Sequence, residues 1–316
     1  MRIQNDELIH TYSIVAYDAE AQLFGVAVQT HQMGVGRLVP WLLPGYGAIA
    51  TQSLVNISYG PIGLRMLREG WKAEDVLAGL TSGDPNAQRR QVACIDAEGR
   101  AAAFTGSGCI REAGHYVGEG FTVQANMMTR PTVIEAMRQA YETTTGTLAE
   151  RMMAALHAAQ VEDGDIRGMQ SAALKIVSTQ KNVPDWATVF DLRVDEHLSP
   201  LDELGRLVRL RQAQQFDERG YAALAAGELG KALAEWGEAR RLAPELEELA
   251  FWQAVTLADQ RPSEDALRTA ARILSSALER ELRRDQWLDL LIRLEECGLI
   301  ARQGTAVELL EVLSAL

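Results

Sequence analysis

The sequence predicts an α+β domain over residues 1–199, followed by an all-helical domain over residues 200–316. Three observations lead to this organisation. Strand-like and helix-like segments alternate in blocks before Pro200, the helix-like segments of that part come in pairs, and β-branched residues become scarce after Pro200. Paired helices disfavour a doubly wound parallel sheet, in which single crossover helices alternate with strands. They favour two antiparallel sheets packed together, each covered by one layer of helices.

The first block is predicted to be β structure. Residues 12–17 and 23–29 are rich in β-formers and flank a short polar segment, so they predict a hairpin. Glycine-rich stretches follow at 34–36 and 45–47, and a short apolar strand is then expected at 48–51.

Two helices and a second β block come next. Residues 60–70 and 73–80 carry apolar side chains at helical spacing. Two short strand pairs are then predicted, 91–95 with 100–105 and 115–117 with 121–124.

A second pair of helices and two closing strands complete this domain. Pro131 suits the first position of a helix that runs to about Thr144, and another helix is predicted over residues 148–160. The closing strands are expected at 171–178 and 187–194.

The helical part begins with a predicted helix over residues 201–215. Beyond it, the sequence follows the roughly 34-residue tetratricopeptide pattern of aromatic, Gly, Ala, aromatic, Ala and Pro. The matching residues are Phe216, Gly220, Ala232, Trp236, Ala239 and Pro244. Small residues let paired helices approach closely, and the second aromatic fills the groove between them. One period later only Ala266 matches, so a generic helical bundle remains the alternative to a tetratricopeptide-like domain.

The composition argues against several classes of partner. The formal net charge is -12, and no cluster of Lys and Arg is interleaved with aromatics, so we expect no nucleic-acid partner. No stretch of about 18 apolar residues is present, and the start of the chain lacks the apolar run of a signal peptide. We therefore expect a cytoplasmic protein that does not span a membrane. Neither the cysteines nor the histidines show metal-ligand spacing, so no metal and no cofactor are expected.

Four polar or glycine-rich segments at predicted strand ends could carry binding groups, namely 51–60, 106–109, 124–128 and 164–171. Binding groups are often mounted in this way on a rigid scaffold. The alternative for each segment is a turn that needs Gly for its backbone and Asn or Asp for local capping. Cys109 with His115 as its base is a separate hypothesis, although a lone Cys is more often a small buried hydrophobe.

Longer matches give a resemblance to a known family. They are Thr-Tyr-Ser-Ile-Val-Ala-Tyr-Asp at 11–18, Gly-Val-Ala-Val at 25–28, Ala-Thr-Gln-Ser-Leu-Val-Asn at 50–56, Ser-Tyr-Gly-Pro at 58–61, Gly-Glu-Gly-Phe and Gln-Ala-Asn-Met within 118–127, and Gly-Asp-Ile-Arg-Gly-Met-Gln-Ser-Ala-Ala at 164–173. From Thr11 to Asp195 the chain resembles the domain-of-unknown-function ten-twenty-eight family, which is grouped with the N-terminal nucleophile (Ntn) hydrolases. The resemblance implies a four-layer αββα sandwich.

The resemblance also implies a mechanism. In Ntn hydrolases, the first residue of the mature chain attacks an amide carbonyl with its side chain, and its own α-amine takes the proton. The matching residue here is Thr11, which follows ten other residues, so it could act only after residues 1–10 are removed. The sequence also lacks the early-strand Lys of proteasome-like members, so Arg37 or Arg167 would have to supply positive charge.

Together these observations give a candidate site for a small polar or peptide-like ligand. The catalytic candidates are Thr11, Ser13, Asn126, Asp165 and Arg167, and the substrate-binding candidates are His31, Gln52, Asn56 and Ser171. Thr11 would be the nucleophile, Arg167 an anchor for an anionic group, and Asn126 a contact for an oxyanion or a substrate amide.

Two classes of function remain open. In the first, the α+β domain is an Ntn-type amide-bond hydrolase. In the second, it is a non-catalytic scaffold that binds a small ligand or peptide, while the helical repeats bind a protein partner. Homo-oligomerisation through the helical layers is a further expectation.

Overall fold

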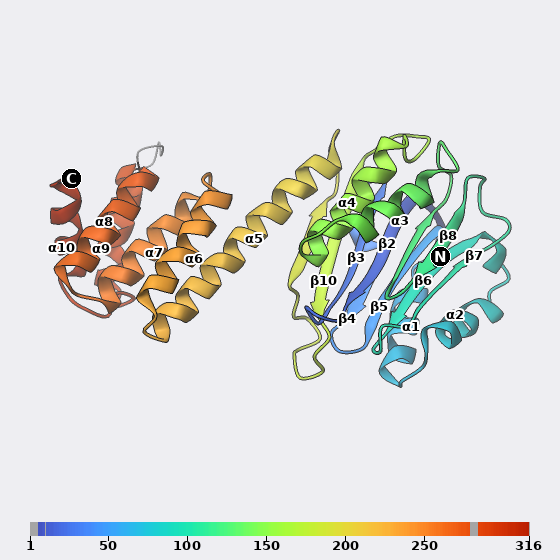
Figure 1. The fold of residues 1–316 in the computed structure, drawn as a ribbon, viewed down its shortest axis with the longest axis horizontal. Coiled ribbons are helices and arrows are strands. Elements are labelled where there is room, and N and C mark those ends of the chain that lie inside the picture. The colour runs from blue at the N-terminus through green and yellow to red at the C-terminus, as the bar shows by residue number, and fades with distance from the viewer. Residues whose placement is uncertain (1–5, 10, 279–283, 316) are drawn as a thin grey trace, which may run out of the picture. The chain divides into compact units, whose positions relative to one another are not determined.

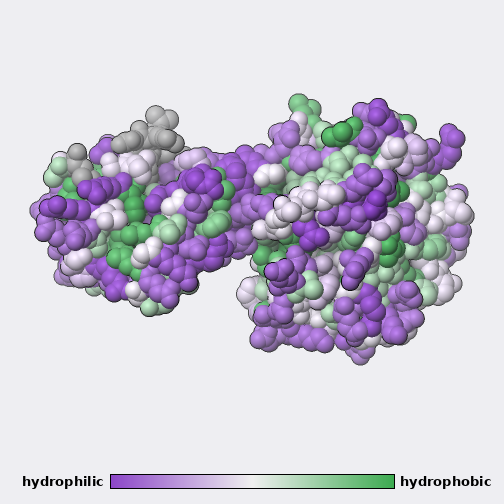
Figure 2. Space-filling model, viewed as in Figure 1, coloured by the Kyte–Doolittle hydropathy of each residue, from purple (hydrophilic) through white to green (hydrophobic). Residues whose placement is uncertain are grey.

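The computed structural model describes residues 6–9, 11–278 and 284–315. The chain forms two compact units, Met1–Val208 and Arg209–Leu316, and the division falls within helix α5 (Pro200–Ala225). Figure 1 shows strands and helices in the first unit and helices in the second. In the view of Figure 2, hydrophilic residues predominate on the surface of each unit.

The first sheet of the first unit contains antiparallel neighbours throughout its described strands. In spatial order these are β1 (Asp6–Ile9), β5 (Gly47–Asn56), β6 (Arg90–Asp96) and β7 (Ala101–Thr105), and β4 (Pro40–Leu43) also pairs with β5. Helices α1 (Tyr59–Arg68) and α2 (Ala73–Ser82) pack on one face of this sheet. The core beneath them includes Ile49, Val76 and Val92.

The second sheet is also antiparallel. Its order is β11 (Phe190–Val194), β10 (Ser171–Ser178), β3 (Leu23–Thr30), β2 (Thr11–Asp18), β9 (Phe121–Ala125) and β8 (Gly114–Gly118). Strands β3 and β2 therefore lie at its centre, and both contact the first sheet. Side chains of β2 alternate between the two faces of the sheet. Ile14 packs toward the helices, and Val15 packs between the two sheets.

Helices α3 (Val133–Thr143) and α4 (Leu148–Val161) cover the other face of the second sheet. Helix α4 lies over β2 and β3, and α3 lies over β8 and β9. A capping box starts α4, in which the Thr147 hydroxyl accepts from the Glu150 N–H and the Glu150 carboxylate accepts from the Thr147 N–H.

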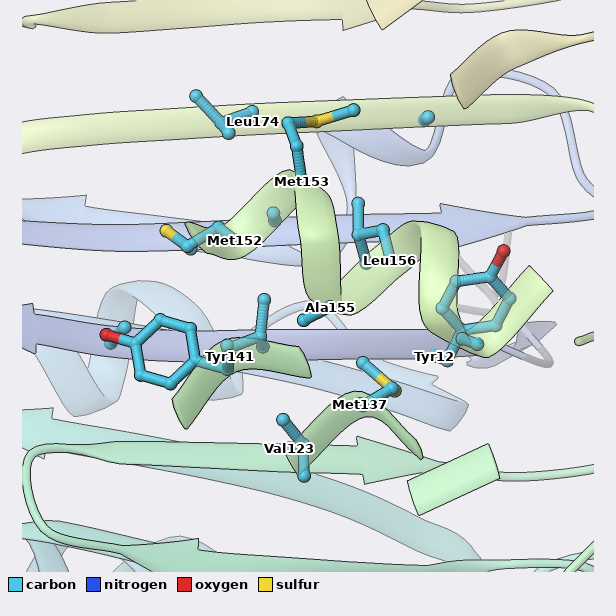
Figure 3. Packing of buried hydrophobic residues seen from close by; sticks show 14 of the residues in the cluster. Tyr12, Val123, Met137, Tyr141, Met152, Met153, Ala155, Leu156 and Leu174 are labelled. Atoms are coloured by element: carbon cyan, nitrogen blue, oxygen red, sulfur yellow. The ribbon is translucent and has the colours of Figure 1, made fainter. Parts of the chain in front are cut away.

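The layer between α4 and the second sheet is rich in methionine. Figure 3 shows Met152, Met153 and Leu156 of α4 in this layer, together with Met137 of α3 and Tyr12 of β2. The absence of a side chain at Gly25 makes room for Met152, since a Cβ at Gly25 would lie 2.6 Å from the Met152 sulfur. The close approach of α4 to β3 therefore depends on glycine at this position.

The predicted strand pairs are confirmed. The hairpin of β2 and β3 and the pairs β6–β7 and β8–β9 all form in antiparallel register. Strands β1 and β4 were not expected from the sequence. β4 begins at Pro40, which lacks an N–H and is tolerated at the start of an edge strand.

The second unit contains antiparallel helices that pack through small and aromatic side chains. After α5 these are α6 (Leu229–Leu242), α7 (Glu247–Gln260), α8 (Glu264–Leu278), α9 (Arg284–Glu296) and α10 (Thr305–Ser314). Trp236 is fully buried and lies on Gly220, where a Cβ would be 2.2 Å from the indole. Within the described ranges, none of the helices is both long enough and apolar enough to cross a bilayer.

Candidate functional site

The space between the two sheets is apolar at one end and polar at the other. Val15, Val26 and Ile95 fill the apolar end. Two to four residues further along the same inward faces, the side chains become polar while they stay fully buried. The polar residues are Thr11, Ser13, Thr30, Gln52, Gln91, Gln124 and Asn126. Buried polar groups must be paired to be tolerated, so their partners define this end of the layer.

Gln91 is the centre of the network. Its Oε1 accepts hydrogen bonds from Gln52 Nε2 at 2.7 Å and from Asn126 Nδ2 at 2.8 Å. Its Nε2 lies within hydrogen-bond distance of Thr105 Oγ1 at 2.9 Å, the Ala125 carbonyl at 2.9 Å and the Gly114 carbonyl at 3.0 Å. One glutamine on β6 thus links both sheets and fixes how the amides of Gln52 and Asn126 are oriented.

The amides of Gln52 and Asn126 both point toward Thr11. Gln52 Nε2 donates to the Thr11 carbonyl at 3.2 Å, and Asn126 donates to the same oxygen from its backbone N–H at 3.1 Å and from Nδ2 at 3.4 Å. The main chain at the head of β2 is therefore held from both sheets. The Thr11 hydroxyl is fully buried, and no hydrogen-bond partner for it lies in the described part of the chain.

Two non-glycine residues with positive φ directly follow these two amides. Ser53 has φ 69° and follows Gln52, and Met127 has φ 59° and follows Asn126. Left-handed backbone at residues other than glycine costs on the order of 1–3 kcal/mol and persists where the surroundings impose it. Such strain gathers at functional sites, and here it lies beside both donors that contact Thr11.

Ser13 lies within the same network, and its hydroxyl is hydrogen-bonded to two of the network's glutamines. Its hydroxyl donates to Gln52 Oε1 at 2.6 Å and accepts from Gln124 Nε2 at 2.6 Å. These bonds use its proton and one lone pair, so Ser13 orients the neighbouring glutamines.

A second cluster, formed by Asp165, Arg167 and His31, lies just beyond the end of β3, beside the start of β2. Arg167 binds the buried Asp165 carboxylate through Nε at 3.1 Å and Nη2 at 2.8 Å. The His31 N–H donates to the same carboxylate at 3.2 Å, and His31 Nδ1 lies 3.3 Å from the Met169 carbonyl. His31 follows Thr30, whose register partner is Thr11, so the cluster borders the polar end of the sandwich.

Asp165 also acts on Tyr12, the residue after Thr11. Burial, and secondarily the negative charge of Asp165, raise the pKa of the Tyr12 phenol far above its usual range. The phenol donates to Gln160 Oε1 at 3.1 Å and stays protonated. Tyr12 therefore fixes the start of β2 from the helical side.

Two of the nine candidates bond outside the Gln91 network, although one of them, Ser171, pairs with Thr30 in the row of residues that includes Thr11. Asn56 Oδ1 accepts from the Ser58 N–H at 3.1 Å at the start of α1, and Asn56 lines a separate cavity of ≈ 320 Å³ with Tyr59 and Asp84. The Ser171 hydroxyl donates to the Gln32 carbonyl and accepts from the Val35 N–H at 3.2 Å, which anchors the loop after β3. Asn56 performs the local capping role that such residues often have, whereas Ser171 joins segments that are far apart in the sequence.

Cys109 and His115 are not paired with one another. Burial raises the pKa of the Cys109 thiol, which lies 3.4 Å from the Arg90 carbonyl. His115 Nδ1 instead lies 2.8 Å from Thr105 Oγ1, at the outer end of the Gln91 network. A high thiol pKa without a neighbouring base is unfavourable for a nucleophile.

Sequence reasoning missed Gln91 and Thr105, and it included Gln124 only as part of the candidate segment 124–128. The signal was present, because Gln91 shares the inward face of its strand with Ala93 and Ile95. A polar amide at a position where alternation predicts core is unusual and indicates a buried network. In the described ranges, no group of three or more His, Cys, Asp or Glu side chains is arranged to hold a metal ion.

Comparison with known proteins gives a family and one solved relative. Residues 11–204 match the model of a family described as "Family of unknown function (DUF1028)". The chain is also similar to the crystal structure of protein SPO2555 from Silicibacter pomeroyi, which carries the same family model. The identity is 32%, the similarity covers 63% of this chain and 88% of that chain, and the TM-score is 0.57. No curated protein matches the chain. The family match covers more than half of the sequence and begins at Thr11, so the chain belongs to the DUF1028 family.

Proposed function

We propose that the first unit is an amide-bond hydrolase of the Ntn type, with Thr11 as its nucleophile once residues 1–10 are removed. The observation that carries this proposal is the position of the Thr11 hydroxyl. It lies at the head of a central strand, fully buried and without a hydrogen-bond partner among the described residues, beside two oriented amide donors. A buried hydroxyl left unpaired costs about 1–3 kcal/mol, which a catalytic role would explain.

The layers of the first unit support the same class. Helices α1 and α2 cover one sheet, α3 and α4 cover the other, and the sheets face one another. This layer order supports the proposed αββα sandwich of the Ntn type. Positive φ at Ser53 and Met127 adds the local strain typical of a built site.

In the proposed reaction, Thr11 Oγ1 attacks the amide carbonyl and transfers its proton to the freed α-amine of the same residue. An α-amine titrates at about 7.7–8.0, which suits a general base near neutral pH. The C–N bond then breaks, the amine product leaves with that proton, and water hydrolyses the acyl ester on Thr11. Asn126 would contact the oxyanion or a substrate amide once its N–H groups leave the Thr11 carbonyl, and Arg167 would anchor an anionic substrate group.

Removal of residues 1–10 is a requirement of this chemistry. While the Thr11 nitrogen is part of a peptide bond, it has no basic lone pair to accept a proton. His10, on the other side of that bond, lies outside the described residues.

One observation favours the non-catalytic alternative, a scaffold that binds a small polar or peptide-like ligand. Thr11, Gln52 and Asn126 are all fully buried, so a substrate would reach them only after the surrounding segments move. The experiment therefore has to distinguish a Thr11 that reacts with a substrate from a Thr11 that stays buried and unreactive.

A protease site placed directly before Thr11 allows the amine to be freed after folding. We expect the trimmed protein to be acylated at Thr11 by a β-lactone probe, detected as a mass increase on the Thr11 peptide, and to hydrolyse members of an amide panel. Thr11→Ala should lose several powers of ten in rate. Thr122→Ala is the matched control, because Thr122 is also fully buried with an unpaired hydroxyl on the next strand.

Acylation of the trimmed wild type and of Thr122→Ala, but not of Thr11→Ala, would support the hydrolase. A folded, trimmed protein that neither reacts with the probe nor cleaves any panel member would contradict it. Saturable ligand binding by that inert protein would then favour the scaffold.

We further propose that the second unit is tetratricopeptide-like and binds a protein partner, and that the chain acts in the cytoplasm as a homo-oligomer. The packing of Trp236 on Gly220, with fully buried Ala232 and Ala239, supports the repeat assignment. Trp236→Ala should cost about 3–5 kcal/mol in the unfolding of this unit. Sedimentation measures the oligomeric state directly.

A further inference from the structure

A cavity of ≈ 170 Å³ lies in the second unit where α6 ends and α7 begins, with α8 forming its far side. Its walls combine one cation, one anion and apolar carbons. The residues used below are Arg240, Ala243, Leu246, Glu247 and Ala250. The cavity is smaller than the roughly 300 Å³ at which pockets for drug-sized ligands begin, so it suits a group of a few non-hydrogen atoms.

Arg240 is half-buried and its hydrogen-bonded partner is a neutral side chain. The guanidinium donates to Gln253 Oε1. Gln253 is fully buried, and its Nε2 in turn donates to Asp217 Oδ1 at 2.6 Å. Burial raises the pKa of Asp217 to about 6, so this carboxylate is itself poorly solvated. A guanidinium has five N–H donors, and the bond to Gln253 uses only one of them.

Other arginines of this unit are paired differently. Arg209 binds Glu245 at 2.5 Å, Arg219 binds Glu235 at 2.9 Å and Arg302 binds Glu308 at 2.8 Å. In the part of the second unit that the structure describes, no carboxylate lies within ion-pair distance of Arg240. Burial lowers the pKa of Arg240, and the more distant Asp217 only partly opposes this. A buried guanidinium is costly unless an anion with good geometry offsets its desolvation.

Glu247 faces the same cavity from the first turn of α7. It is half-buried and forms no ion pair with Arg240. A ligand that joined these two side chains would need a carboxylate at one end and an N–H donor at the other. Ala243, Leu246 and Ala250 would contact an apolar group between them.

We propose that this cavity binds an α-amino-acid group, with its carboxylate on Arg240, its nitrogen on Glu247 and its side chain on the apolar wall. A free apolar amino acid and the C-terminal residue of a peptide share this chemistry. They differ in the nitrogen, which is a cationic ammonium in the first and a neutral amide N–H in the second.

Calorimetric titration of the full chain with three probes tests the proposal. L-leucine carries both charges, N-acetyl-L-leucine represents a peptide C-terminus, and L-leucinamide lacks the carboxylate. We expect saturable binding of L-leucine or N-acetyl-L-leucine in the millimolar range or tighter, and none of L-leucinamide. Tighter binding of L-leucine identifies a free amino acid as the ligand, and tighter binding of N-acetyl-L-leucine identifies a peptide end.

Variants locate the binding. Arg240→Gln should weaken it about tenfold or more, because a charge-assisted hydrogen bond is lost. Arg241→Gln is the matched control, since Arg241 is the exposed neighbour and pairs with Glu238 at 2.8 Å. Glu247→Gln should weaken L-leucine and leave N-acetyl-L-leucine unchanged, and it serves as the deciding variant if Arg240→Gln does not fold. Absence of saturable binding, or equal binding by folded Arg240→Gln, or an unchanged L-leucine affinity in Glu247→Gln, would overturn the proposal.

Discussion

The two ends of the inter-sheet layer are equally buried but are held together by different forces. At the apolar end, Val15, Val26 and Ile95 pack without directional constraints. At the polar end, Gln91 joins Gln52 and Asn126 through bonds that require one orientation of each amide. An apolar layer tolerates small changes of shape, whereas a satisfied polar network specifies one geometry and loses several partners when one member is removed.

Of the substitutions that compare the two ends, removal of Gln91 should lower the free energy of unfolding most. Gln91→Leu takes away the acceptor of two buried amides and the donor to Thr105 and two carbonyls. We expect the free energy of unfolding to fall by about 3 kcal/mol or more, because each stranded group costs about 1–3 kcal/mol. Urea denaturation followed by circular dichroism measures the loss.

Gln29 provides a control for this prediction. It is as deeply buried as Gln91, but neither its amide nitrogen nor its amide oxygen has a hydrogen-bond partner among the described residues. Gln29→Leu should therefore be neutral or stabilising. Equal destabilisation by the two substitutions would show that the changed side-chain shape, and not the network, explains the effect of Gln91→Leu.

A change at the apolar end should have a smaller effect. Ile95→Val removes one methylene from a fully buried side chain and leaves every polar partner in place. We expect the free energy of unfolding to fall by about 1 kcal/mol. The same urea experiment measures it, and a loss as large as that of Gln91→Leu would remove the distinction between the two ends.

Thr122 tests the opposite case, in which removal of a buried polar group should stabilise the protein. Its hydroxyl is buried between the sheets without a partner in the described ranges, close to the border of the two ends. Thr122→Val keeps the shape and removes the unpaired oxygen, so we expect stabilisation by about 1 kcal/mol. A lower melting temperature in calorimetry would mean that the hydroxyl has a partner in solution.

The smallest expected effect concerns pH. Partial burial lowers the pKa of His115, so the folded protein favours the neutral ring that contacts Thr105. This contribution is fully present above the unfolded pKa of about 6.5 and is lost as the pH falls through the lower folded pKa. Since the ring is largely exposed, the loss should stay below about 1 kcal/mol. Wild type should lose slightly more stability than His115→Gln between neutral and acidic pH, and an identical loss would contradict the assignment.

Most of the fold could be predicted because local patterns determine it. Alternation identified β2 and β3, and helical spacing identified α1 to α4 within a few residues. Helix α5 was expected to end at 215 but continues to Ala225. Gly220 usually weakens a helix, yet here it is required in the middle of one because Trp236 packs on it. The repeat pattern named both Gly220 and Trp236, but it did not predict that the helix runs through the glycine.

The candidate site was predictable only in part. Thr11, Ser13, Gln52 and Asn126 were expected together and do share one network. Asn56 and Ser171 look alike in sequence but bond to neighbouring backbone, which no spacing reveals. Gln91 was missed because its importance arises from contacts with four other strands and with Asn126, which the local sequence does not reveal.

Met152 lies on the backbone of β3 at Gly25, fully buried under α4. Oxidation to the sulfoxide would add a polar oxygen to a layer packed with apolar side chains. An oxidant can therefore reach this sulfur only when α4 separates from the sheet. The rate of Met152 oxidation can be measured as a gain of one oxygen in peptide mass. This rate reports how often α4 opens away from the sheet in the folded first unit.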